Sequence, residues 1–141
     1  MLELSKREAF ALVCLRHLGD VVLWGALDCS DLIARGELGC GLPDRRATHT
    51  VQTYADQNPE SAEKPRLGDL GFFGYSWRLP VHVVSSSFGG MVLSADGATR
   101  AIQQLDTAAR IPSARVRLHE NVGWYRSAPF LGWRRHHELD S

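Results

Sequence analysis

The sequence changes character near Pro65, and this change limits the possible folds more than any other feature. Before it, apolar residues recur at helical spacing, and after it they gather in short runs rich in β-branched and aromatic side chains. Glycine or proline bounds these runs, which is typical of short antiparallel strands. Helices followed by strands predict an α+β fold, with N-terminal helices packed on a mostly antiparallel sheet of about five strands.

The helical part opens with a capping box, in which the side chains of Ser5 and Glu8 each bond a free amide of the first turn. Apolar residues then keep helical spacing as far as Leu18, and Gly19 supplies a left-handed stop. The other elements expected from these patterns are helices at residues 29–38 and 48–55, an exposed loop at 56–66, strands at 69–74, 81–88, 91–95, 114–119 and 130–134, and a helical turn at 106–110.

Length and charge exclude several classes of protein. The 141 residues suit one compact domain, residues 1–141, and the 16 Lys and Arg residues balance the 16 Asp and Glu residues. A neutral chain lacks the basic surface of a nucleic-acid-binding protein. There is no apolar run of about 18 residues for membrane insertion, and the first ten residues lack the apolar core of a signal peptide. Three cysteines without a CxxC pair predict reduced thiols.

Cys29 is the first candidate for chemistry, because the pattern places it at the start of the second helix. A thiol there feels the positive end of the helix dipole, which lowers its pKa and favours the nucleophilic thiolate. The carboxylates of Asp28 and Asp31 oppose this effect. A buried structural cysteine is the alternative, and composition alone favours it.

His82 is the second candidate, and it lies in a run of β-branched residues that predicts a strand. A histidine in such a place is more often structural when it is considered alone. A cysteine and a histidine far apart in sequence can nevertheless meet in the fold, as nucleophilic catalysis by a thiol requires.

Four short motifs, taken in order, make the sequence more specific. They are Trp24-Gly25, Asp28-Cys29-Ser30, the run Leu67-Gly68-Asp69-Leu70-Gly71-Phe72-Phe73-Gly74, and His82-Val83. Their order resembles that of the NlpC-type family of cell-wall cysteine peptidases, which commonly show WGG, DCSGL, PGDLVFF and HVGIY segments. Residues 42–48 look like the LPRxT segment of that family, and residues 114–135 are similar to the endings of short members from phages.

The resemblance implies a papain-like fold in which Cys29 is the nucleophile and His82 is the base that activates it. It also implies that amides near Cys29 stabilise the oxyanion, and that Asp28 and Ser30 position a peptidoglycan stem peptide. Helix capping explains Asp28 and Ser30 equally well. The family cleaves stem peptides, typically at the bond between D-γ-glutamate and the diamino acid. No cofactor or metal is implied.

The sequence departs from the family at a third catalytic position, where Ser94 stands in place of a frequent histidine. Asp96 is two residues on and offers a carboxylate, so the third group is Ser94, Asp96 or neither. A two-residue turn at 89–90 would face both side chains away from His82. A three-residue loop at 88–90 would place His82 opposite Asp96, with Ser94 on the same face. We expect this odd-numbered loop, since only its register serves catalysis.

Two further features carry weaker signals. The segment His136-His137-Glu138 invites a metal-site interpretation, but adjacent histidines lack the spacing of a zinc site, and we expect a solvated tail. Four aromatic residues could line a glycan groove, although core packing is the commoner role: Trp77, Trp124, Tyr125 and Trp133.

These features predict a peptidoglycan-degrading cysteine endopeptidase that cleaves stem-peptide amide bonds. The phage-like ending predicts a virion tail protein with other phage tail proteins as partners, and a cytoplasmic enzyme otherwise. The alternative is an inactive or weakly active peptidoglycan-binding or structural tail-tip domain, which Ser94 and the replacement of a family glycine by Asp31 favour. A thiol-dependent acyltransferase on the same fold is a third hypothesis.

Overall fold

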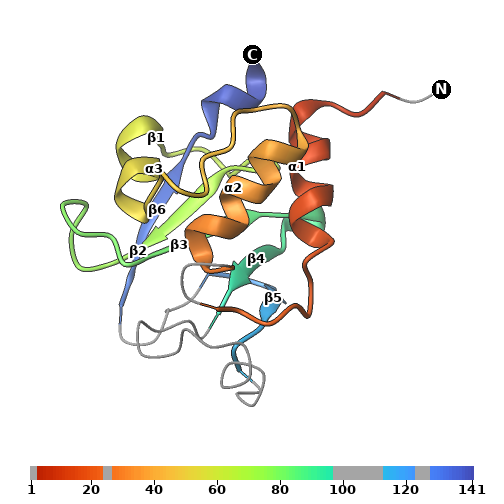
Figure 1. The fold of residues 1–141 in the computed structure, drawn as a ribbon. Helices are drawn as coiled ribbons and strands as arrows, with labels where there is room; N and C mark the ends of the chain where they lie inside the picture. Colours follow the sequence, from red (N-terminus) through yellow and green to blue (C-terminus); the bar gives the residue numbers. More distant parts are fainter. Residues whose placement is uncertain (1–2, 24–26, 97–112, 123–127) are drawn as a thin grey trace.

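The computed structural model describes residues 3–23, 27–96, 113–122 and 128–141, which form three α-helices and an antiparallel sheet of six strands (Figure 1). The helices are α1 (Lys6–Leu15), α2 (Cys29–Gly39) and α3 (Val51–Gln57), and two 3₁₀ turns form η1 (Phe88–Gly90) and η2 (His137–Asp140). The strands are β1 (Glu60–Ser61), β2 (Leu70–Phe73), β3 (His82–Ser86), β4 (Val92–Ala95), β5 (Val116–His119) and β6 (Phe130–Arg134). None of the described helices is long and apolar enough to cross a lipid bilayer.

The sheet has the order β1-β6-β2-β3-β4-β5, and every neighbouring pair is antiparallel. The predicted α+β class is therefore confirmed. The sheet is larger than expected because residues 60–61, which we expected in an exposed loop, pair with β6 as Glu60↔Arg134 and Ser61↔Trp133. The helical turn expected at 106–110 lies outside the described residues.

The first two helices pack closely against each other (Figure 1). α1 has the predicted capping box: Ser5 Oγ accepts a hydrogen bond from the Glu8 amide at 3.1 Å, and the Ser5 amide donates to the Glu8 carboxylate at 3.0 Å. A glycine on α2 permits the close approach, because a Cβ atom at Gly36 would lie 2.7 Å from the Phe10 ring. This packing holds α2, which begins at Cys29, against α1.

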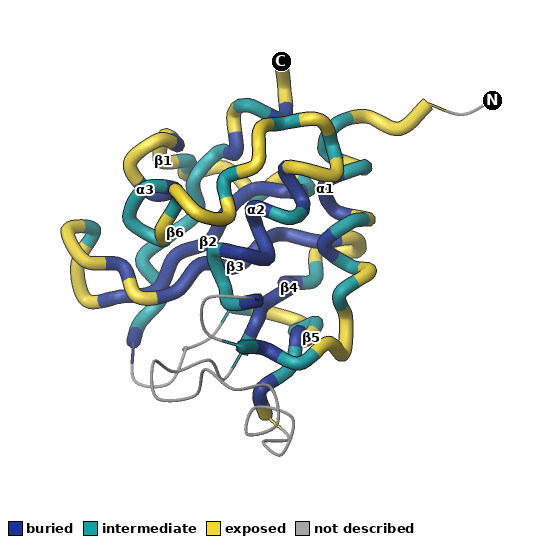
Figure 2. The backbone as a smooth tube through the Cα atoms, in the orientation of Figure 1, coloured by how far each residue is buried: buried dark blue, intermediate teal, exposed yellow. Residues whose placement is uncertain are grey.

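The main core lies between the helices and the sheet face that carries Phe72, Val83 and Leu93 (Figure 2). Buried side chains from all three helices fill it: Phe10, Cys14, Leu32, Ile33, Tyr54 and Ala55. A smaller cluster contains Phe73, Val84, Val92 and Ala128. Because side chains alternate along a strand, His82 and Ser94 belong to the sheet face of this smaller cluster.

The β3–β4 hairpin has the odd-numbered loop that the sequence predicts. Two ladder pairs define its register, Ser85↔Leu93 and Ser86↔Val92. The Ser87 amide bonds the carbonyl oxygen of Met91 at 2.7 Å, which leaves residues 88–90 as the loop. Both glycines of this loop are left-handed, with φ of +68° and +74°. Continued toward the other end of the strands, the register sets His82 opposite Asp96.

Only His137 of the two C-terminal histidines is exposed, as a solvated tail requires, and His136 contradicts that expectation. His136 is 0% exposed, with Nε2 at 2.7 Å from the Glu37 carboxylate and Nδ1 at 3.0 Å from the Gly68 carbonyl oxygen. The ring also packs edge-on against Phe10, with ring centroids 4.9 Å apart. The prediction was wrong because its partner, Glu37, lies 99 positions earlier, and the local sequence carries no sign of that contact.

Candidate active site

Two aspartates form a capping box at the start of α2. Asp28 Oδ1 accepts a hydrogen bond from the Asp31 amide at 3.1 Å, and the Asp28 amide donates to Asp31 Oδ2 at 3.4 Å. The Ser30 hydroxyl donates to Asp28 Oδ1 at 3.0 Å. Asp28 therefore has the capping role that we had weighed against substrate binding, and Cys29 is the first residue of the helix, as predicted.

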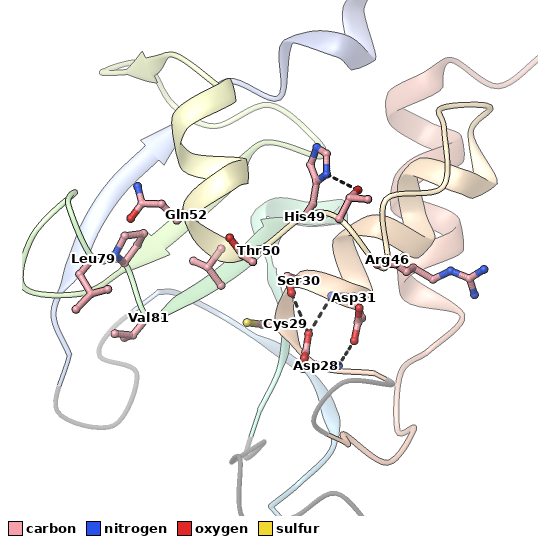
Figure 3. Close-up of a pocket in the computed structure, with 14 residues that line it drawn as sticks. Asp28, Cys29, Ser30, Asp31, Arg46, His49, Thr50, Gln52, Leu79 and Val81 are labelled. Carbon is pink, nitrogen blue, oxygen red and sulfur yellow. Dashed lines mark hydrogen bonds between the residues drawn. The ribbon is translucent and has the colours of Figure 1, made fainter.

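The Cys29 thiol lies between α2 and the start of β3. The residue is half-buried, and its sulfur points from α2 toward the segments that contain Thr50 and Val81 (Figure 3). The backbone amides of Val83, Ser30 and Cys29 lie near the sulfur, where their N–H groups favour the thiolate. The helix start thus brings the thiol against the strand that His82 begins.

Burial raises the pKa of the Cys29 thiol to about 12, and the charge of Asp28 adds to the rise. The hydrogen bonds from the backbone amides lower the pKa but do not offset burial. The expected lowering of the pKa is therefore wrong, because the loss of hydration on burial outweighs the backbone amides at the helix start. Burial and the charge of Asp28 also raise the pKa of the Asp31 carboxyl, to about 6. A thiol in this environment is protonated at neutral pH and needs a base to become a nucleophile.

An open cavity of about 620 Å³ adjoins the thiol (Figure 3). Its walls come from three segments: residues 28–31 at the start of α2, residues 46–52 leading into α3, and residues 79–81 before β3. His49 and Gln52 make one wall polar, whereas Leu79 and Val81 make another apolar. This volume is in the range of small-ligand sites, roughly 300–1,000 Å³. A short peptide segment can therefore enter beside the sulfur.

His82 is the first residue of β3, and only 1% of its surface is exposed. Its ring packs against Phe73, with ring centroids 5.8 Å apart. Both chain neighbours of His82 lie at the candidate site, since Val81 lines the cavity and the Val83 amide reaches the Cys29 thiol. The fold therefore brings together the two segments that carry the predicted nucleophile and the predicted base.

Ser94 on β4, the residue predicted for the third catalytic position, is hydrogen-bonded to His82. Its Oγ atom lies 2.7 Å from His82 Nε2 and 2.5 Å from Asp96 Oδ1. Oδ2 of Asp96 lies 2.6 Å from Nε2 of His119 on β5. The four side chains form one continuous chain of hydrogen bonds. The local sequence of His119 carries no sign of this role, because its side chain reaches Asp96 only when β5 lies next to β4.

The structure assigns a packing role to two of the four aromatic residues. Trp77 packs edge-on against Phe72, with ring centroids 5.6 Å apart, and Trp133 packs against the smaller cluster. Trp124 and Tyr125 lie outside the described residues. Within the part of the chain that the structure describes, no group of three or more His, Cys, Asp or Glu side chains is arranged to hold a metal ion.

Solved structures similar to this chain are NlpC/P60 domains. The P60 domain of an antigen from M. avium subspecies paratuberculosis has a TM-score of 0.63 and 19% identity, over 92% of this chain and 93% of that one. The NlpC/p60 domain of the peptidoglycan hydrolase SagA has a TM-score of 0.60 and 19% identity, over 88% of this chain and 95% of the SagA domain. A Staphylococcus aureus protein similar to a lipoprotein of the NLP/P60 family has a TM-score of 0.63 and 19% identity. That match covers 92% of this chain and 41% of the S. aureus chain.

A scan against protein-family models and a search of curated proteins give no match. The structural likeness shows that this chain has the papain-like α+β fold of NlpC/P60 domains.

Proposed function

We propose that this protein is a cysteine peptidase that hydrolyses amide bonds in peptidoglycan stem peptides. The observation that carries the proposal is the position of the Cys29 thiol, which borders an open cavity and meets β3 beside His82. One structural neighbour is described as a peptidoglycan hydrolase, which supports the substrate class. The ordered motifs that resemble NlpC-type peptidases support the same reaction.

In the first half of the proposed reaction, His82 accepts the proton of the Cys29 thiol, and the thiolate attacks the carbonyl carbon of the scissile amide. Burial raises the pKa of the resting thiol, so the sulfur becomes a strong nucleophile only when His82 takes its proton. The backbone amides of Cys29 and Ser30 lie beside the sulfur, where they can stabilise the oxyanion without any side chain.

The intermediate collapses when the leaving amine takes the proton from His82, which breaks the C–N bond and leaves a thioester on Cys29. Water then attacks the thioester, gives a proton to the imidazole and releases the carboxylic acid, and that proton returns to the thiol. Nε2 of His82 is bonded to Ser94. Proton exchange with the thiol, the amine and water is therefore assigned to Nδ1.

The stem peptide would lie in the cavity beside Cys29, with Asp28 and Ser30 at one of its walls. We propose the bond between D-γ-glutamate and the diamino acid as the scissile bond, on the family resemblance. Asp28 and Ser30 are joined by a hydrogen bond of 3.0 Å, so they act as one polar group toward the substrate.

Incubation with purified sacculi tests the proposal. Mass spectrometry of the released muropeptides is expected to find new amine ends with the wild-type protein and none with Cys29→Ala. A wall-binding domain without activity is the second candidate, because Ser94 and Asp31 depart from the family pattern. Equal binding of both proteins to sacculi without any product would favour that domain. Products that carry an added amine would instead identify an acyltransferase.

We propose further that the protein acts from a virion tail, in contact with other tail proteins. The support is the similarity of residues 114–135 to the endings of short phage members of the family. Mass spectrometry of purified phage particles is expected to find peptides of this chain in the tail fraction. Particles without these peptides, together with protein in the host cytoplasm, would favour a cytoplasmic enzyme.

A further inference from the structure

We propose that Asp96 is a positioning residue that decides which nitrogen of His82 carries the proton, acting through the hydroxyl of Ser94. Three distances carry the proposal: 2.7 Å from His82 Nε2 to Ser94 Oγ, 2.5 Å from Ser94 Oγ to Asp96 Oδ1, and 2.6 Å from Asp96 Oδ2 to His119 Nε2. Its consequence for catalysis rests on the proposed function, whereas the effect on the proton position follows from hydrogen bonding alone.

The direction of each hydrogen bond follows from what the groups can donate. The Ser94 hydroxyl has one proton, and a carboxylate can only accept, so Ser94 donates to Asp96 Oδ1. Ser94 Oγ then offers only lone pairs to His82, and Nε2 must be the donor in that bond. The neutral imidazole therefore carries its proton on Nε2 and has the lone pair of a base on Nδ1.

His119 holds the carboxylate in the orientation that this direction requires. Its ring bonds Oδ2 of Asp96, which leaves Oδ1 turned toward Ser94. The side-chain exposure rises along the hydrogen-bonded chain, from 2% for His82 to 19% for Asp96 and 43% for His119. The Asp96 carboxylate is thus largely shielded from solvent, and its hydrogen bond to the more exposed His119 fixes its orientation.

Asp96 also supplies the charge that a serine at the third position lacks. When the thiol proton reaches Nδ1, the His82 ring becomes an imidazolium that donates from both nitrogens. Asp96 Oδ1 lies 3.9 Å from Nε2, in surroundings where attraction between charges is screened less than in water. Serine and aspartate together therefore do what a single carboxylate does in other catalytic triads.

Nitrogen-15 NMR of the histidine rings tests the proton position in the intact protein and needs no substrate. For the neutral His82 ring of the wild-type protein, we expect the tautomer with the proton on Nε2. In Asp96→Ala the Ser94 hydroxyl is released to donate to Nε2, and the tautomer with the proton on Nδ1 is expected to gain population. A wild-type ring with its proton on Nδ1, or the same tautomer in both proteins, would overturn the proposal.

A double-mutant cycle separates the proposed path from a general structural effect. In a Ser94→Ala background, Asp96→Ala is expected to leave the His82 tautomer unchanged, because the linking hydroxyl is absent. An equal change in both backgrounds would contradict the role of Ser94. His119→Ala, at the exposed end of the chain of hydrogen bonds, is expected to shift the tautomer less than Asp96→Ala. A wild-type His82 ring with its proton on Nδ1 overturns the proposal even if a variant fails to fold.

Kinetics then test the catalytic consequence. Asp96→Ala is expected to lower kcat for stem-peptide hydrolysis roughly ten- to a hundredfold, at or below the lower end of general acid–base contributions, because Asp96 acts only through Ser94. KM is expected to stay the same, because Asp96 does not line the cavity. A raised KM with unchanged kcat would contradict the positioning role. A wild-type protein that shows the expected tautomer but no hydrolysis would refute the peptidase and support the hydrogen-bond assignment.

Discussion

Nε2 of His82 on β3 lies 2.7 Å from Oγ of Ser94 on β4, twelve positions later in the chain. The three-residue loop at 88–90 makes this contact possible, because its register puts both side chains on one face of the sheet. Because Nε2 is bonded to Ser94, we assign the chemistry proposed for Cys29 to Nδ1. The orientation of the imidazole is thus a property of the hairpin.

Ser94→Ala is expected to lower kcat roughly ten- to a hundredfold with little change in KM, because the imidazole loses the group that orients it. Steady-state kinetics on a stem peptide measure this change. Ser85→Ala is the matched control, since Ser85 is a buried serine of the same hairpin that faces the helices and bonds a backbone carbonyl. Equal losses in the two variants would indicate a fault in packing rather than in orientation.

Alkylation of Cys29 by iodoacetamide is expected to accelerate steadily as the pH rises from 7 to 10. The pKa of the thiol is raised to about 12 by burial, so the reactive thiolate increases about tenfold per pH unit below that value. Intact-protein mass spectrometry follows the reaction, with Cys29→Ala giving the background from Cys14 and Cys40. A fast rate that is already constant near pH 7 would mean that the resting thiol is ionised.

Asp31→Asn is expected to raise the free energy of unfolding at pH 7 by about 1–3 kcal/mol. The carboxyl has a pKa of about 6 in the folded protein, above its usual 3.8, because it is buried beside Asp28. The folded state thus holds the proton more tightly than the unfolded state. The free energy of unfolding of the wild-type protein therefore falls as the pH rises from about 4 to about 6, and it stays at the lower value above pH 6.

Urea denaturation at pH 4 and pH 7 measures this difference. Asparagine can still accept the amide of Asp28, which bonds the Asp31 carboxylate at 3.4 Å, so the cap is retained. Asp56→Asn, at an exposed position on α3, is the control and is expected to change stability little. A gain in stability that is the same at both pH values would contradict the titration of Asp31.

Glu37→Ala is expected to destabilise the fold by roughly 3–5 kcal/mol, because it leaves buried partners of the carboxylate unsatisfied. Glu37 is 1% exposed, and its oxygens lie 2.7 Å from the Tyr54 hydroxyl, 2.7 Å from His136 Nε2 and 3.1 Å from an Arg45 nitrogen. Thermal or urea denaturation measures the loss. Glu138→Ala removes the more exposed partner of Arg45 and is expected to cost much less.

Local patterns in the sequence predicted the elements that position the site. The capping box at Ser5 and the helix that begins at Cys29 depend on neighbouring residues, and both are confirmed. The three-residue loop at 88–90 was predicted because only its register places Ser94 and Asp96 on the same face of the sheet as His82. This loop is confirmed as well. The assignment of Cys29 and His82 as a catalytic pair stays a prediction.

Contacts between distant segments were beyond prediction. The burial of His136 depends on Glu37, and the short strand at residues 60–61 depends on β6, so neither follows from its local sequence. The pKa of Cys29 was mispredicted for a similar reason: the position at a helix start can be inferred from the sequence, but the burial that raises the pKa cannot. The link from Asp96 to His119 likewise exists only once β5 pairs with β4.

Hydrolysis of a defined stem peptide tests the central claim most directly. The peptide L-Ala–D-γ-Glu–diaminopimelate is incubated with the wild-type protein, with Cys29→Ala and with His82→Ala, and the release of the diamino acid is followed by mass spectrometry. We predict release by the wild-type protein and none above background by either variant. Equal release by the wild-type protein and Cys29→Ala, or no release by the wild-type protein from this peptide or from sacculi, would contradict the account.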